Sequence, residues 1–368
     1  MRITKIVITG GPCGGKSTAM SWIQNAFSEK GYGVLFIPET ATELISGGAA
    51  PWTCGSNLEF QKCQMELQME KERIFEQAAR SMDREKVLIV CDRGALDNKA
   101  YMTEEEFRQT LEAVHTNEVQ LRDSYDAVFH LVTAAKGARE YYTTANNTAR
   151  KESPEEAASL DDKLISAWTG HPHFRMIDNS TGFEDKLRRL IAEINSFLGE
   201  PEPLEIKRKF LIQYPDIQWL ESNPNCRRVE IIQTYLKSGS GNEVRVRQRG
   251  SGGNFIYFKT TRRRTDSGDK VEIEQRLTQE EYLSALMDAD TSRRQIRKTR
   301  YCLTWQNQYF EIDVYPFWSE QAIVEIDLRN REEEIFFPEK LKVIREVTGE
   351  AEYETPSLSK QHGNQKLC

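Results

Sequence analysis

The chain has 368 residues, a formal net charge of −7 at neutral pH, and 38% apolar residues. This length suits two domains better than one, and the acidic balance argues against a general nucleic-acid-binding protein. The seven cysteines include no Cys-x-x-Cys pair, which is typical of reduced thiols in a cytosolic protein. No apolar run approaches the roughly 20 residues that a membrane-spanning helix needs. We therefore expect a soluble, cytoplasmic protein.

Residues 1–199 alternate short apolar runs with helical patterns, which predicts a nucleotide-binding α/β domain. The segments 58–83 and 183–198 have helical periodicity. Strands alternating with helices indicate a parallel, doubly wound sheet. The polar stretch 136–163 is expected to be a mobile lid. Five apolar runs predict the buried strands, namely KIVITG, VLFIPE, VLIVCD, AVFHLV and FRMIDN.

A second domain is predicted from residue 204 to residue 353. The prolines of GEPEP make residues 200–203 a linker. Beyond it, apolar and polar residues alternate with a period of two in segments such as EVRVRQR, KVEIEQRL and AIVEIDL, which indicates antiparallel strands. One helix interrupts them at TQEEYLSALMDA, where Thr278 and Glu281 have the spacing of a capping box. Residues 354–368 are expected to form a frayed tail.

The stretch GGPCGGKST has the spacing of a phosphate-binding loop. It follows a β-branched strand and precedes a helical run, as the G-x-x-x-x-G-K-[ST] motif requires. We expect its amide groups to hold phosphate at a helix N-terminus, Lys16 to reach the β- and γ-phosphates, and Ser17 to bind Mg²⁺. Cys13 is not expected to act as a nucleophile, because the loop works through backbone groups. The predicted nucleotide-binding residues are Gly10, Gly11, Pro12, Cys13, Gly14, Gly15, Lys16, Ser17 and Thr18.

Three more residues complete the predicted catalytic set with Lys16. Asp92 ends the apolar run VLIVCD, where an acid can hold Mg²⁺ through water; a plain helix cap is the alternative. Arg93 follows it directly. Glu39 ends VLFIPE, at the strand edge where ligands bind in open α/β sheets, so it is expected either to position or deprotonate an acceptor or to cap a helix.

The order of the phosphate-binding loop, PE, DRG, the lid and IDN resembles the P-loop ATPases and kinases that include bacterial ribosylnicotinamide kinases. The resemblance covers roughly residues 3–198. It implies binding of a nucleoside triphosphate, either GTP or ATP. Asn179 in FRMIDN is the candidate for a contact with the nucleotide base.

Charged residues occupy alternate positions on strand after strand of the second domain. Each strand carries one sign of charge, whereas a solubilising surface usually mixes signs. The pattern favours a charged face inside a β-barrel, where basic rows bind phosphate groups and acidic rows bind a divalent metal. An amphipathic sheet with its charged face in water is the alternative. The rows are Lys207 and Lys209; Arg245, Arg247 and Arg249; Glu272 and Glu274; Lys298 and Arg300; Glu311 and Asp313; Glu325 and Asp327.

This pattern resembles the CYTH, or triphosphate tunnel, family over roughly residues 203–350. The family's motifs are ExExK, RxR, a strand lysine, ExE, a basic pair and late acids. The resemblance implies an eight-stranded tunnel that uses Mg²⁺ or Mn²⁺. The implied metal ligands are Glu205, Glu272, Glu274, Asp313 and Glu325; the implied phosphate-binding residues are Lys207, Lys209, Arg245, Arg247, Lys259, Lys298 and Arg300.

Lys207 departs from the family pattern, because it replaces the second glutamate of ExExK. A lysine at this position repels a metal ion and attracts phosphate. Metal-dependent hydrolysis by this domain is therefore in doubt, whereas phosphate binding is compatible with the change.

The fusion of the two domains resembles the eukaryotic family of photoreceptor-channel (TRPL) translocation-defect proteins. This resemblance implies a regulator that binds a nucleotide, with GTP favoured, and whose tunnel accepts a phosphorylated lipid headgroup in peripheral contact with a membrane. Two functions stay open. One is a slowly hydrolysing nucleotide-binding protein that also binds a polyphosphate, an organic phosphate or an anionic phospholipid. The other is a bifunctional enzyme that joins a small-molecule kinase to a metal-dependent triphosphatase.

Overall fold

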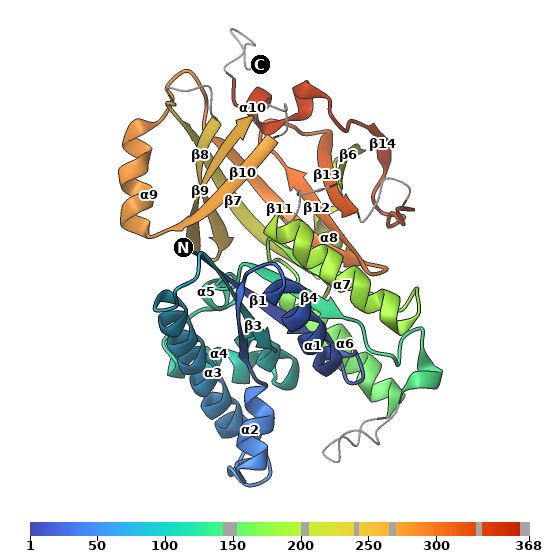
Figure 1. Cartoon of the computed structure of the whole chain (residues 1–368). Coiled ribbons are helices and arrows are strands. Elements are labelled where there is room, and N and C mark those ends of the chain that lie inside the picture. Colours follow the sequence, from blue (N-terminus) through green and yellow to red (C-terminus); the bar gives the residue numbers. More distant parts are fainter. Residues whose placement is uncertain (143–152, 200–205, 239–242, 265–269, 329–332, 361–368) are drawn as a thin grey trace. The chain divides into compact units, whose positions relative to one another are not determined.

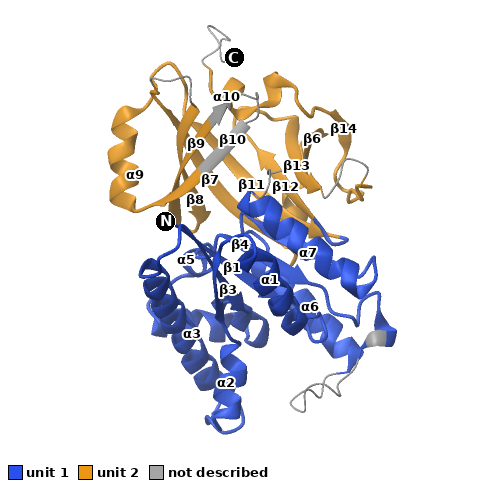
Figure 2. Ribbon diagram, in the orientation of Figure 1, with its two compact units in different colours: residues 1–205, 306–308 blue, residues 206–305, 309–368 orange. Residues whose placement is uncertain are grey.

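A computed structural model describes residues 1–142, 153–199, 206–238, 243–264, 270–328 and 333–360 (Figure 1). The chain divides into two compact units (Figure 2). Unit 1 comprises residues 1–205 and 306–308, and unit 2 comprises residues 206–305 and 309–368. Each unit has its own sheet and its own apolar core.

Unit 1 contains a parallel five-stranded sheet in the order β2-β3-β1-β4-β5. The central strand β1 pairs with β3 from Arg2 to Ile8 and with β4 from Ile6 to Thr9. The predicted parallel α/β domain is thus confirmed. The strands are β1 Arg2–Thr9, β2 Gly33–Ile37, β3 Lys86–Asp92, β4 Ala127–Leu131 and β5 Phe174–Ile177.

Helices cover both faces of this sheet (Figure 1). On one face, Phe27 and Leu190 pack with Ile6, Leu88 and Phe129 in one buried cluster. On the other face lies α3, which Ser56 caps by accepting the N–H of Glu59. The helices are α1 Lys16–Ser28, α2 Thr40–Ser46, α3 Asn57–Arg80, α4 Glu104–Ala113, α5 Glu118–Arg122, α6 Pro154–Trp168 and α7 Phe183–Leu198, with 3₁₀ turns η1 Ala95–Tyr101 and η2 Arg139–Tyr141.

The predicted lid differs from the structure in its second half. Residues 154–163 begin the regular helix α6 instead of a mobile segment. The cause is local, because Ser153 and Glu156 form a capping box and Pro154 occupies the first turn. Residues 143–152 of the predicted lid lie outside the described residues.

Unit 2 contains a nine-stranded sheet in the order β10-β9-β8-β7-β11-β12-β13-β6-β14. The registered pairs of its described strands are antiparallel, which confirms the predicted β domain. Among the described residues, no pairing joins the end strands β10 and β14 into a closed ring. The strands are β6 Ile206–Gln213, β7 Cys226–Leu236, β8 Glu243–Ser251, β9 Asn254–Arg264, β10 Lys270–Leu277, β11 Ile296–Trp305, β12 Gln308–Val314, β13 Gln321–Leu328 and β14 Val343–Glu346.

The two faces of this sheet differ as the period-two pattern predicts. Phe210, Ile312 and Val324 pack into an apolar cluster on one face. The alternate residues form the charged face, on which Arg249 of β8 and Tyr309 of β12 interact electrostatically although β7 and β11 separate their strands. The sheet therefore curls toward this face. The charged face carries Lys207, Lys209, Arg245, Arg247, Arg249, Glu274, Lys298, Arg300, Glu311, Asp313, Glu325 and Asp327.

The start of the predicted frayed tail is ordered. Glu354 forms an ion pair with Lys209, and Arg294 donates to the carbonyl oxygen of Leu358. These contacts fix the backbone up to Lys360, and residues 361–368 lie outside the described part. The predicted capping box of α9 is present. The short helices of unit 2 are α8 Ile217–Ser222, α9 Gln279–Ala285 and α10 Thr355–Leu358, with 3₁₀ turns η3 Leu286–Asp288 and η4 Ala351–Tyr353.

Across the described residues, no helix has the length and apolarity that crossing a membrane requires.

Candidate functional site

The phosphate-binding loop joins the carboxyl end of β1 to the amino end of α1, where the sequence predicts it. Gly10 has a φ of 139°, and a Cβ there would lie 2.1 Å from the carbonyl oxygen of Leu131. Gly15 caps α1 with a φ of 95°. Both conformations favour glycine. The loop is therefore a closely packed turn that directs backbone groups toward the start of a helix.

Lys16 folds back over this loop. Its ammonium group donates to the carbonyl oxygens of Gly10 at 2.8 Å and Gly11 at 3.0 Å. The side chain is buried, whereas the neighbouring Ser17 and Thr18 are exposed. The lysine cation thus lies within the loop where phosphate oxygens are expected.

Asp92 lies at the carboxyl end of β3. Its Oδ1 atom is buried and has no hydrogen-bond partner within the described part of the chain. Burial and the charge of Glu39 raise the pKa of Asp92, although Lys16 opposes the shift. An unpartnered carboxylate oxygen at this edge fits a Mg²⁺ ion or its bound water, so the residues present are compatible with the metal.

Glu39 and Arg93 form an ion pair across the ends of β2 and β3, with Nε 2.5 Å from Oε1. Burial alone would raise the pKa of Glu39, but the charges of Arg93 and Lys16 lower it to about 2. Arg93 has a φ of 71°, which is uncommon for a residue other than glycine. Its Nη1 atom is buried and has no hydrogen-bond partner among the residues that the structure describes. The structure thus brings Lys16, Glu39, Asp92 and Arg93 to one edge of the sheet.

The sequence gives no signal for Asp161 on α6, yet this residue supports the loop. The Asp161 side chain is fully buried. Its Oδ1 accepts hydrogen bonds from the backbone N–H groups of Gly11 at 2.9 Å and Thr133 at 3.2 Å. The same oxygen contacts His130 Nε2 at 2.9 Å, and the second carboxylate oxygen, Oδ2, contacts Lys136 Nζ at 2.9 Å. A helix of unit 1 therefore holds the phosphate-binding loop by a carboxylate.

Asn179 does not have the free amide that a base contact requires. Its Nδ2 donates to the carbonyl oxygens of Thr133 at 2.8 Å and Lys136 at 2.6 Å, and its Oδ1 accepts from Lys186 at 2.8 Å. These bonds connect the segments after β4 and β5. The prediction that Asn179 reads the base is wrong, because its polar atoms are already engaged within unit 1.

Arg139, within the predicted lid, forms an ion pair with Glu155 at the start of α6.

On the charged face of unit 2, the lysines of β6 face the acids of β13. Lys207 lies 3.4 Å from Asp327, and Lys209 lies 3.1 Å from Glu325. Each pair is directly opposite in the register. Burial would raise the pKa of Glu325, but Lys207, Arg300 and the neighbouring lysines lower it below its usual range.

Arg300 is the centre of the next group of charges. Its guanidinium contacts Glu311 at 2.5 Å, Asp313 at 2.7 Å and Glu325 at 3.4 Å. Glu311 and Glu325 are opposite each other in the register, so this cation separates two like charges. Lys298 donates to Oδ2 of Asp313 at 2.5 Å, an oxygen that also accepts a hydrogen bond from Arg300.

Arg247 on β8 contacts Glu274 on β10 at 2.6 Å. Burial and the like charges of Arg245 and Arg249 lower the pKa of Arg247, and Glu274 only partly opposes them. The basic row of β8 therefore places three like charges close together on the charged face.

Lys259 does not join this row. The register places Arg247 opposite Phe258 and Val246 opposite Lys259, and directly opposed residues share a face. Lys259 therefore shares the face of the buried Val246, and Thr260 occupies the charged face next to Glu274 at 3.3 Å. The prediction of Lys259 as an inward phosphate ligand is wrong by one residue, because the hairpin register is not readable from the strand pattern.

The predicted metal ligands of unit 2 are only partly described. Glu205 and the side chain of Glu272 lie outside the described residues. Glu274, Asp313 and Glu325 each pair with a cation. In the part of the chain that the structure describes, no group of three or more His, Cys, Asp or Glu residues could hold a metal ion. The described acids of this face therefore do not fit a metal site.

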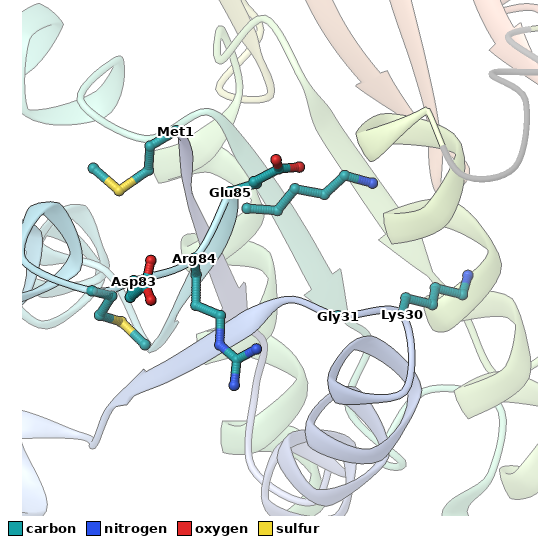
Figure 3. A pocket seen from close by; sticks show the side chains of 8 residues that line it. Met1, Lys30, Gly31, Asp83, Arg84 and Glu85 are labelled. Carbon is teal, nitrogen blue, oxygen red and sulfur yellow. The ribbon is translucent and has the colours of Figure 1, made fainter.

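A surface pocket of unit 1 lies away from these residues. It is lined by Met1, Lys30, Gly31, Asp83, Arg84 and Glu85, with Met82 and Lys86 (Figure 3). Met1 precedes β1 and Lys86 begins β3, so the pocket lies at the amino ends of these two strands, whereas the phosphate-binding loop follows the carboxyl end of β1. We assign no role to it.

Comparison with known proteins supports the first unit most directly. Residues 5–186 match the family model of an AAA domain. No curated protein sequence matches the chain. Two crystal structures of NE1496, described as a hypothetical protein and as an inorganic triphosphatase, have 27% and 26% identity and TM-scores of 0.31 and 0.32. They cover 42% and 44% of this chain and 97% of their own chains.

A third structure, the PH1012 protein from Pyrococcus Horikoshii OT3, has 16% identity and a TM-score of 0.26, and covers 34% of this chain and 80% of its own. At TM-scores this low, we base no conclusion on any of the three likenesses. The match to the AAA domain, together with the loop geometry, indicates a nucleotide-binding P-loop unit at residues 5–186.

Proposed function

We propose that unit 1 binds a nucleoside triphosphate with Mg²⁺, with GTP favoured, and hydrolyses it slowly, while unit 2 binds a phosphate-bearing ligand on its charged face. The observation that carries the proposal is the loop that places Lys16 among backbone groups at the start of α1. Such a loop wraps the phosphates of a nucleotide.

The chain offers the ligands that a magnesium nucleotide needs. Ser17 is exposed at the start of α1, and Asp92, at the carboxyl end of β3, has a buried oxygen without a partner among the described residues. These two residues would hold Mg²⁺, which when bound offsets phosphate charge. Lys16 would bind the phosphate oxygens and orient them within the loop.

Slow hydrolysis agrees with the low pKa of Glu39 and its ion pair with Arg93. A carboxylate with a pKa of about 2 that is paired with Arg93 is a weak general base near neutral pH. Its charge holds Arg93 in position. This arrangement favours nucleotide binding over rapid turnover.

Binding without catalysis is also the simplest role for unit 2. Lys207 is paired with Asp327, and the described acids are paired with cations. A charged face built from such pairs can accept phosphate oxygens at its arginines, but the described carboxylates Asp327, Glu325, Glu274, Glu311 and Asp313 are engaged by cations instead of a metal ion. The polyphosphate, organic phosphate and phospholipid headgroup remain the candidate ligands, and the resemblance to translocation-defect proteins favours the headgroup.

The test uses the full chain. Titration calorimetry with GTP and with ATP, each with Mg²⁺ and with a chelator, should give Mg²⁺-dependent binding that is tighter for GTP. Phosphate release should be slow. Absence of binding by both nucleotides would contradict the role of unit 1.

A small-molecule kinase is the second candidate for unit 1. It is favoured by the buried, unpartnered Nη1 of Arg93 beside Glu39, since an acceptor could take the place of a missing hydrogen-bond partner. Nucleotide consumption that requires a nucleoside-like acceptor would support this candidate. Equal consumption with and without a panel of nucleosides would favour the slow hydrolase.

A further inference from the structure

The charged face has two parts, which lie on different strands of the sheet. The first part comprises the charged residues of β6, β11, β12 and β13. The cations here lie with acids at ion-pair distance, so a phosphate group would have to displace a carboxylate to reach them. The pairs are Lys207 with Asp327, Lys209 with Glu325, Lys298 with Asp313, and Arg300 with Glu311, Asp313 and Glu325.

The second part lies on β7, β8 and β10. Arg245, Arg247 and Arg249 form its basic row, and Glu274 is the described carboxylate that contacts Arg247. Arg249 is 2% exposed. Three arginines in one row, two of them partly buried and Arg249 fully buried, create a positive potential that favours an anion. This part is therefore the more favourable place for phosphate.

Two hydrogen-bond donors in this part have no partner. The Nε atom of Arg247 is buried and unpartnered among the described residues, and so is the Nε2 atom of Gln233 on β7. Gln233 is 3% exposed, and the register places it directly opposite Arg247. Opposed side chains in a sheet have Cβ atoms about 5 Å apart, so both donors lie around one small volume.

Buried donors without acceptors are rare and unfavourable, because each has lost its hydrogen bonds to water. A single tetrahedral oxyanion would satisfy both. A phosphate monoester carries about −1.5 to −2 charges and offers several acceptor oxygens, which suits the positive row of β8. A longer polyphosphate would extend toward carboxylates on the first part of the face.

We infer that Gln233 and Arg247 form a metal-free binding subsite for a phosphate monoester or a short diphosphate on the charged face. The inference rests on the proposed phosphate binding by unit 2 and gives it a location and a ligand class. Gln233 is neutral and does not belong to any charged row, so the sequence pattern alone does not identify it.

The test is titration calorimetry on the full chain with Lys16→Ala as the common background, so that the loop of unit 1 does not bind the probes. The probes are pyrophosphate and glycerol 3-phosphate, each with a chelator. Gln233→Leu should weaken binding about tenfold, the effect of losing one hydrogen bond to a charged group. Gln248→Leu is the matched control, since Gln248 lies on the opposite face of β8.

A second variant keeps the test independent of folding. Gln233→Glu places a carboxylate opposite Arg247, which should raise the thermal unfolding temperature while abolishing phosphate binding. A third variant, Lys207→Met combined with Asp327→Asn, removes a pair of the first part without changing the net charge. It should lower the affinity for both probes less than Gln233→Leu does.

The outcomes separate the subsite from the proposed function. If the background protein binds the probes and Gln233→Leu binds them equally well, the subsite is overturned while phosphate binding by unit 2 stands. If the Lys207 and Asp327 double variant loses binding instead, the site belongs to the first part of the face and the subsite is again overturned. If the background protein binds no probe in solution or on vesicles, phosphate binding by unit 2 itself is overturned.

One more experiment distinguishes a lipid headgroup from a free phosphate compound as the source of the phosphate group. Phosphatidylcholine vesicles with and without phosphatidic acid present the same monoester on a membrane. Binding to the vesicles that depends on Gln233 and is stronger than binding to glycerol 3-phosphate assigns the subsite to a lipid headgroup. Equal or stronger binding of the free compound assigns it to a soluble ligand.

Discussion

The carboxylate of Asp161 accepts a hydrogen bond of 2.9 Å from the backbone N–H of Gly11, although 150 residues separate the two in the chain. The same carboxylate contacts Thr133, His130 and Lys136. Burial would raise the pKa of Asp161, but the contacts with His130 and Lys136 lower it below its usual range. Helix α6 therefore fixes one peptide of the phosphate-binding loop through a charged acceptor.

Asp161→Asn should lower the affinity for the nucleotide about tenfold. The amide can accept fewer hydrogen bonds than a carboxylate and presents an N–H₂ group to donors, so Gly11 loses a charged acceptor. Asp162→Asn is the matched control, because Asp162 also pairs with Lys136 but is exposed and does not contact Gly11. Calorimetric affinity that falls equally in both variants would contradict the positioning role of Asp161.

Lys16→Ala should abolish nucleotide binding, because the loop loses the cation that lies against its carbonyl groups. Lys62→Ala, which removes a partly exposed lysine paired with Glu59 on α3, should leave the affinity unchanged. Titration calorimetry measures both. Unchanged affinity in Lys16→Ala would refute the assignment of the loop.

The loop could be predicted from sequence because its chemistry is local. Its glycines, lysine and serine are consecutive, and each conformation follows from a few neighbouring residues. Asp161 could not be predicted, since its contact with Gly11 depends on how α6 packs after a long connection. Asn179 was misassigned for the same reason, because its partners Thr133, Lys136 and Lys186 come from other segments.

In unit 2, the charged and apolar faces follow from the period-two pattern. The hairpin between β8 and β9 shows the limit of that pattern, since the register alone decides that Lys259 shares a face with Val246. Gln233 has no charge that would mark it. The order of residues 354–360 depends on the long-range pair of Lys209 and Glu354.

The ion pair of Glu39 and Arg93 predicts a defined pH dependence. Its carboxyl pKa falls from the usual 4.5 to about 2, so the pair stabilises the folded state above about pH 4.5 and this contribution is lost as the pH falls toward 2. Glu39→Gln should therefore lower the unfolding temperature at about pH 6 and have much less effect near pH 3. Glu43→Gln, which changes a more exposed glutamate on α2, is the control. If the difference in unfolding temperature between Glu39→Gln and the wild type is the same at about pH 3 and about pH 6, the ion pair with Arg93 is contradicted.

Lys207 tests whether unit 2 can be made catalytic. Lys207→Glu would place a carboxylate beside Asp327 and Glu325, which supplies oxygen ligands for a divalent metal. We expect the wild-type chain to release no phosphate from tripolyphosphate with Mg²⁺ or Mn²⁺, in the Lys16→Ala background, and Lys207→Glu to gain activity. Phosphate release from tripolyphosphate by the chain that retains Lys207 would instead favour the bifunctional enzyme.

Arg300 should be the most important single cation for the stability of unit 2. Arg300→Met leaves Glu311, Asp313 and Glu325 without a shared partner. Breaking a buried ion-pair group in this way costs about 3 to 5 kcal/mol of unfolding free energy. Arg228→Met, which removes a half-exposed arginine paired with Glu230, should cost less than about 1 kcal/mol.

The pH dependence separates a charge effect from lost packing. In the wild type, burial opposes ionisation of Asp313 but Arg300 and Lys298 lower its pKa, so their stabilisation is present at neutral pH and is lost in acid. Without Arg300, protonation relieves the repulsion among the acids, so the deficit of the variant should shrink from pH 7 toward about pH 4. Urea unfolding, followed by tryptophan fluorescence, measures the loss of unfolding free energy in Arg300→Met at each pH. A deficit that is equal at both pH values would assign the loss to packing of the arginine side chain rather than to its charge.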